Sequence, residues 1–149
     1  MRRLSVLGLV IALFAFTTTA ALAASPHIVG TPKTSLSGNT LTVSASVAGL
    51  GNVSSVDLSL EGELDVFSQC YNRGGKNPAA DNKQETTIVD ESGTFPVRNG
   101  RTNATFTISP VGTLDCPGNQ VAIVESVSGT LDIVYQGESL GEIPVNYTR

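Results

Sequence analysis

Acidic side chains recur along one short stretch of the sequence, at Asp57, Glu61, Glu63 and Asp65. If the stretch is a strand, residues two apart share a face at about 6–7 Å, and glycoside hydrolysis uses two carboxyl groups at similar separations. Such a pair needs a cleft, which an exposed row on one strand does not provide. We therefore expect a charged outer face that discourages edge pairing and keeps the domain soluble. A hydrolase that uses this row is a remote alternative; we expect no enzyme and no catalytic residue.

Other residue types that do chemistry are few. His27 is the sole histidine, and it falls close to the expected N-terminus of the processed chain, where it has no positioned partner. Asp81, Asp90 and Glu91 offer oxygen atoms of the kind that calcium takes, but no EF-hand loop surrounds them. The sequence therefore predicts no metal site and no cofactor.

The segment CYNRGGKNP, from Cys70 to Pro78, gathers positive charge in a chain whose formal net charge is −4. Loops on a rigid scaffold often carry binding residues, and the alternation of the preceding strand places aromatic and amide side chains beside this one. The candidate binding residues are Phe67, Gln69, Tyr71, Asn72, Arg73, Lys76 and Asn77. The structural alternative is that the loop only covers the aromatic side chains, and that its glycines let the chain turn beside a disulfide.

The first residues, MRRLSVLGLVIALFAFTTTAALAA, have the pattern of a secretory signal peptide over residues 1–24. Two arginines precede an apolar run from Leu4 to Phe16, and small residues place the cleavage site after Ala23 or Ala24. The run is too short for a membrane span. We therefore expect a secreted, extracellular protein. Its net negative charge argues against nucleic acid as a partner.

Two cysteines, Cys70 and Cys116, remain in the processed chain. In an oxidising compartment this pair predicts one disulfide, which would stabilise the fold by about 4 kcal/mol in the chain-entropy model. A metal pair and two free thiols are the alternatives, and the lack of a second histidine or cysteine cluster disfavours both.

Alternation of apolar and polar residues predicts strands with one solvent-exposed face at 56–70, 40–47 and 101–108. Gly62 lies inside the first, where we expect a bulge or bend. Asn99-Gly100 predicts a type I′ hairpin turn before the strand that begins at Arg101. Further strands are expected at Gln84–Asp90, Gln120–Val127, Thr130–Gln136 and Ser139–Tyr147, with the last three joined by the turns VSGT and QGES.

About seven to nine short strands in one chain favour an all-β fold, an antiparallel immunoglobulin-like β-sandwich, with a small β-barrel as the alternative. The chain has no tryptophan, so an antibody-type domain with a core Trp on its disulfide is excluded. Residues 25–37 are expected to form a flexible lead-in, and residues 38–149 a single domain.

Several short strings carry a resemblance: GLGN, CYNRGGKNP, GTFPVRNGR and CPGNQ. Together they resemble a group of small secreted bacterial single-domain proteins that share C-x-N-x-GG-N/K-x-P and CPGGQ motifs, over roughly Leu41 to Tyr135. The resemblance implies a single secreted domain and a paired Cys70–Cys116, and it brings no activity with it. Asn119 stands where the motif has a second glycine.

We expect the protein to act by surface recognition of an extracellular glycan, a matrix component or a protein partner. The alternative is a structural or surface-coat component that assembles with itself through exposed strand edges.

Overall fold

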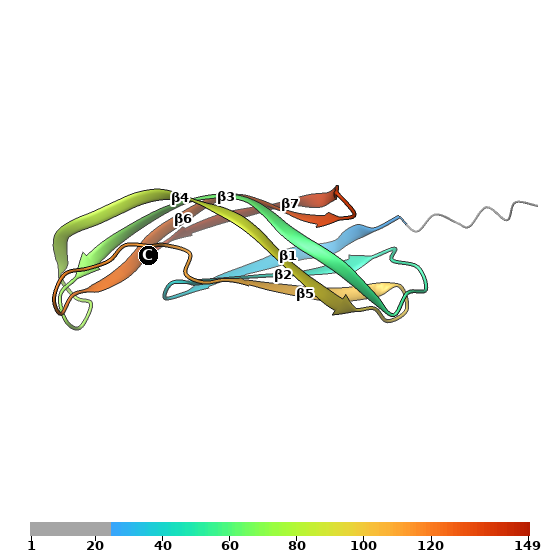
Figure 1. Cartoon of the computed structure of the whole chain (residues 1–149), viewed down its shortest axis with the longest axis horizontal. Coiled ribbons are helices and arrows are strands. Elements are labelled where there is room, and N and C mark those ends of the chain that lie inside the picture. Colours follow the sequence, from blue (N-terminus) through green and yellow to red (C-terminus); the bar gives the residue numbers. More distant parts are fainter. Residues whose placement is uncertain (1–24) are drawn as a thin grey trace, which may run out of the picture.

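The computed structural model describes residues 25–149, which form seven strands in two antiparallel sheets (Figure 1). One sheet has the order β1-β2-β5 and the other β4-β3-β6-β7. The strands are β1 (His27–Ser37), β2 (Thr40–Ala48), β3 (Ser55–Tyr71), β4 (Pro78–Pro96), β5 (Arg101–Ile108), β6 (Val121–Tyr135) and β7 (Glu138–Thr148). Three connections cross between the sheets, as in immunoglobulin-like folds. The predicted sandwich is confirmed, and the barrel alternative is wrong for the described residues.

The signal peptide expected over residues 1–24 lies outside the described residues. Residues 25–149 hold no helix with the length and hydrophobicity that crossing a membrane requires.

The core lies between the sheets and follows directly from the alternation in the sequence. Every second side chain of β3 is buried up to Cys70, apart from the position of Gly62. The buried side chains of β3 face those of β2 and β5; they include Leu58, Leu60, Leu64, Val66, Leu41, Val43, Ala104 and Phe106. The opposite face of each strand is polar and exposed to solvent.

Two glycines bend the four-stranded sheet without dividing its strands. Gly62 of β3 and Gly129 of β6 have φ of 148° and 156°, and a Cβ at either would collide with a carbonyl oxygen of the neighbouring strand. The register of β3 runs through Gly62 without a shift, so this glycine neither forms a bulge nor divides the strand. The turn expected at VSGT is wrong, because β6 continues through Gly129.

The flexible lead-in over residues 25–37 is wrong from His27 onward. β1 pairs antiparallel with β2, from His27 opposite Ala48 to Ser37 opposite Thr40. Its register shifts between Val29 and Lys33, so a bulge interrupts the alternation that would have marked a strand in the sequence.

The Asn99-Gly100 turn is confirmed. Both residues have positive φ, 53° and 70°, and the backbones of Arg98 and Arg101 exchange hydrogen bonds of 2.8 and 3.0 Å. Beyond this pair the chain leaves one sheet for the other, because β4 and β5 belong to different sheets.

The two sheets differ in length, and an irregular segment covers the difference. β3 and β4 have 17 and 19 residues, whereas β2 and β5 have 9 and 8. Residues 109–120, here called the covering segment, run under the long end of the four-stranded sheet (Figure 1). Asn39 exchanges two side-chain hydrogen bonds with Gly112, of 2.6 and 2.7 Å, and Thr87 donates to the Val111 carbonyl at 2.8 Å. Both sheets therefore hold this segment in place.

The contact between Gly112 and Ser68 gives a test of this packing. Ser68 is 1% exposed and its hydroxyl has no hydrogen-bond partner within the described residues, while a Cβ at Gly112 would lie 2.7 Å from that hydroxyl. We expect Ser68→Ala to raise the free energy of unfolding by about 1 kcal/mol. Gly112→Ala should lower it by about 1–3 kcal/mol, and by less when Ser68→Ala is also present.

Urea unfolding of the four proteins of this cycle measures the coupling. Ser128→Ala, at an exposed position of β6, is the control and should change stability by less than about 0.5 kcal/mol. An equal cost of Gly112→Ala with and without Ser68 would contradict the packing described.

Candidate binding site at the disulfide end

The predicted disulfide is present, and it fixes the covering segment to the end of β3. Cys70 and Cys116 are bonded with their Cα atoms 5.7 Å apart, and Cys70 is fully buried. The alternatives of a metal pair or free thiols are therefore wrong. The loop that follows Cys70 is held at its base by this bond.

Asn72 gives the CYNRGGKNP loop its shape. Its backbone N–H donates to the Asn77 carbonyl at 3.0 Å, its side-chain oxygen accepts from the Asn77 N–H at 3.1 Å, and its carbonyl accepts from the Gly75 N–H at 2.9 Å. Arg73 and Lys76 project from this closed loop, exposed and without an ion pair among residues 25–149. The two asparagines thus support the loop, and the two cations are the groups it presents.

Phe67, Gln69 and Tyr71 lie half-buried on the outer face, as the alternation predicted. Two of them already have partners in the fold. The Gln69 amide donates to the Ala79 carbonyl at 3.1 Å, and the Arg149 guanidinium lies 5.1 Å from the centroid of the Tyr71 ring. The aromatic ledge is therefore partly occupied by the chain itself.

Arg149 also ties the end of β7 to β6. Its side chain forms an ion pair of 3.2 Å with Glu125, and its backbone N–H donates to the Glu125 carbonyl at 2.8 Å. A hydrogen bond with Glu125 and partial burial raise the pKa of Tyr71, while the positive charge of Arg149 acts in the opposite direction. These three side chains form one interacting group at the outer face.

Beyond this group, β6 is paired on one side only within the part of the chain that the structure describes. Its pairing with β3 extends to Val121, which lies opposite Tyr71. Its pairing with β7 extends only to Ser126, opposite Thr148, followed by the Arg149 hydrogen bond. Residues 121–124 of β6, here called the open edge, therefore lack a second partner strand within the described residues. In Figure 1 the orange strand β6 continues past the C-terminus toward the left end.

The open edge is apolar and lies beside a hollow. Its sequence is Val-Ala-Ile-Val, and Val121 is 46% exposed. A depression of about 420 Å³ adjoins it, lined by Ile123, Val124, Leu36 and Tyr147 together with residues at the end of β7. Backbone groups without partners and apolar side chains therefore occur together at one place.

Three of the four edge strands of the sheets carry features that discourage pairing. The edge strand β4 bears several charged side chains, β1 has a bulge with Pro32 and Lys33, and β7 contains Pro144. The open edge has none of these features. Sequence reasoning found a strand here but missed its exposure, because where β7 ends relative to β6 depends on the register.

The acidic row lies on the outer face of β3, as predicted, with its members exposed. Three of them accept hydrogen bonds from neighbours: Asp57 from Thr94, Asp65 from Thr86 and Glu61 from Ser59.

Of the other candidates for chemistry, Asp90 lies opposite Glu61 of the acidic row, and the rest are not brought together with it. Asp81, Asp90 and Glu91 are spread along β4, and His27 is exposed, with its Nδ1 2.8 Å from the Ser25 carbonyl. Within residues 25–149 no group of three His, Cys, Asp or Glu side chains is arranged to hold a metal ion.

Lys83, which follows the loop on β4, is already paired. Its Nζ lies 2.7 Å from Glu85 Oε2 and donates to the Thr113 hydroxyl at 2.6 Å. Partial burial alone would raise the pKa of Glu85, but hydrogen bonds from Lys83 and from the side chain and backbone of Thr113 outweigh it and lower this pKa to about 2. This cluster connects β4 to the covering segment.

Neither a family model nor a curated protein matches the chain. Among solved structures, the solution structure of R. palustris CsgH is similar at 12% sequence identity, with a TM-score of 0.32, over 82% of this chain and 92% of that one. At this TM-score nothing is carried over from it. The resemblance to the secreted bacterial group stays a prediction.

The Glu85 cluster predicts a specific loss of stability in acid. Because the pKa of Glu85 is lower in the folded chain, its contribution is complete above the ordinary value of 4.5 and is lost as pH falls toward about 2. We expect the free energy of unfolding to fall more steeply across this range in the unmodified protein than in Glu85→Gln. Urea unfolding at a series of pH values checks this. Glu138→Gln, at an exposed position, is the control, and identical pH profiles for Glu85→Gln and the unmodified protein would contradict the assignment.

Proposed function

We propose that this protein is a secreted, non-enzymatic binding module that captures an extended segment of a partner polypeptide by strand addition at the open edge. The observation that carries the proposal is the difference in register: β6 is paired with β3 to Val121 but with β7 only to Ser126. An incoming strand placed in line with β7 would find unpaired backbone groups of β6, the usual basis of strand addition.

The side chains around the open edge indicate the composition of the partner. Residues alternate in direction along an added strand, so alternate apolar side chains would contact Val121 and Ile123 and the adjoining depression. Arg73 and Lys76 lie at the same end and have no counter-charge in an ion pair of the described residues. An extended segment that alternates apolar and acidic residues fits this surface best.

A protein partner is favoured over a glycan by what already contacts the aromatic ledge. Arg149 lies over the Tyr71 ring, and the Gln69 amide is hydrogen-bonded to backbone. A sugar that stacks on Tyr71 and bonds to Gln69 would have to displace both contacts. We therefore assign the aromatic ledge, formed by Phe67, Gln69 and Tyr71, a structural role beneath the loop that lies beside the open edge.

Secretion belongs to the same proposal. The bonded Cys70–Cys116 pair is consistent with an oxidising compartment, and the first residues have the pattern of a signal peptide. The motifs shared with the secreted bacterial group support the same location.

The test uses a short synthetic peptide in which valine and glutamate alternate, titrated into the isotope-labelled, oxidised protein. We expect amide resonances of residues 121–124 and of the Cys70–Pro78 loop to shift. A peptide of the same sequence, methylated on alternate backbone nitrogens, is the matched control, because it keeps the side chains and loses hydrogen-bond donors. Equal binding of both peptides would contradict strand addition, and shifts with soluble polysaccharides alone would favour the glycan.

A pair of variants tests the location. Val121 and Val53 are equally exposed, at 46% and 48%, and Val53 lies in the loop between β2 and β3. We expect Val121→Asp to weaken binding of the valine–glutamate peptide about tenfold, through lost apolar contact and charge repulsion. Val53→Asp makes the same change in charge and should leave binding unchanged. Equal loss of peptide binding in both variants would show that the effect comes from net charge and would contradict binding at the open edge.

A further inference from the structure

The outer face of the four-stranded sheet carries an uncompensated row of carboxylates across all four strands. Asp90 lies opposite Glu61, Glu61 opposite Asp132, and Asp132 opposite Glu142. Like charges directly opposite one another on a sheet destabilise it. Neither β3, β6 nor β7 contains a lysine or arginine. The fold thus retains a repulsion that a positively charged partner would relieve.

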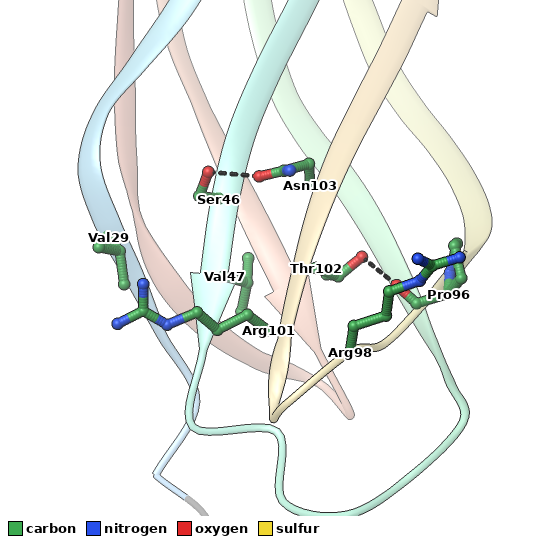
Figure 2. Close-up of a pocket in the computed structure, with 8 residues that line it drawn as sticks. All are labelled: Val29, Ser46, Val47, Pro96, Arg98, Arg101, Thr102 and Asn103. Carbon is green, nitrogen blue, oxygen red and sulfur yellow. Dashed lines mark hydrogen bonds between the residues drawn. The ribbon is translucent and has the colours of Figure 1, made fainter.

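Two arginines form a basic end elsewhere on the molecule. Arg98 and Arg101 flank the Asn99-Gly100 turn and line a depression of about 520 Å³ with Val29, Ser46, Pro96 and Asn103 (Figure 2). Neither arginine takes part in an ion pair among the described residues. Two hydrogen bonds connect residues in the wall of the depression: Ser46 donates to Asn103 at 2.6 Å, and Thr102 donates to the Pro96 carbonyl at 2.8 Å.

The directions of the arginines indicate the shape of what they bind. Figure 2 shows the Arg101 side chain directed toward Val29 and the Arg98 side chain directed toward Pro96. The two guanidinium groups therefore do not clamp one small anion. They present two separate positive charges, which suits a surface with several carboxylates at the spacing of neighbouring strands, about 5 Å.

The cross-strand row of Asp90, Glu61, Asp132 and Glu142 faces outward from the four-stranded sheet, whereas the arginine depression is lined mainly by strands of the other sheet, so the two surfaces cannot meet within one molecule. We propose that the cross-strand row of carboxylates of one copy binds the arginine end of a second copy, so that the protein associates head to tail. Each added copy leaves one acidic and one basic surface free, and such a contact extends into a chain unless it closes into a ring. This inference uses surfaces other than the open edge and does not depend on the proposed function.

The test uses sedimentation velocity of the processed, oxidised protein over a wide concentration range. We expect concentration-dependent association that weakens as salt rises, since exposed ion pairs are screened. Two charge-reversal variants should each stay monomeric: Arg98→Glu with Arg101→Glu, which makes both surfaces negative, and the fourfold change Asp90→Lys, Glu61→Lys, Asp132→Lys and Glu142→Lys, which makes both positive.

Mixing the two variants distinguishes head-to-tail binding from a general effect of charge. Each surface of one variant is then complementary to a surface of the other, so the mixture should associate although neither component does. Lys33→Glu with Ser35→Glu and Ser37→Glu, at exposed positions of β1 that belong to neither surface, makes the same change in net charge as the arginine variant and should associate like the unmodified protein. Thermal unfolding of each variant shows that it is folded.

A monomeric unmodified protein at all concentrations would overturn the proposal, as would a mixture that stays monomeric. Equal loss of association in the Lys33, Ser35 and Ser37 variant would also overturn it, because the effect would then come from net charge. Should a reversal variant not fold, the salt dependence of the unmodified protein decides: association that is insensitive to salt contradicts ion pairing.

Discussion

The unequal length of the two sheets is the constraint on which the rest of this structure depends. A long four-stranded sheet buries apolar side chains of β3 that a shorter three-stranded sheet does not cover. The covering segment supplies the missing layer, and it has no strand pairing of its own to hold it. The Cys70–Cys116 bond, the Asn39 hydrogen bonds and the Glu85 cluster fix it instead. The disulfide therefore acts as part of the second layer as well as a restraint on the unfolded chain.

A second difference in length, between strands of the four-stranded sheet, creates the candidate site. Among residues 25–149, β3 and β6 extend together past the pairing of β6 with β7, and residues 121–124 of β6 are therefore paired on one side only. The CYNRGGKNP loop is held beside this stretch by the disulfide and by the hydrogen bonds of Asn72. A site for an extended polypeptide is thus produced by the ends of strands, with little contribution from a cleft.

Features set by local sequence were predicted, and features set by register were not. The alternation in β3, the Asn99-Gly100 turn and the cysteine pair each depend on a few adjacent residues or on residue type. β1 was missed because its bulge breaks the alternation, and β6 was divided because Gly129 resembles a turn residue. The acidic row across four strands and the open edge depend on which residues lie opposite one another. The register between strands that are distant in the sequence is not evident from a single sequence.

The central claim is that residues 121–124 of β6 form an ordered strand with one unpaired side. Amide hydrogen exchange of the free, oxidised protein, measured residue by residue along β6, tests it most directly. The account predicts slow exchange through Val127–Val134, where β6 lies between β3 and β7, and fast exchange at those amides of residues 121–124 that face away from β3. Uniformly slow exchange along the whole of β6 in the free protein would contradict it, because the edge would then already be paired.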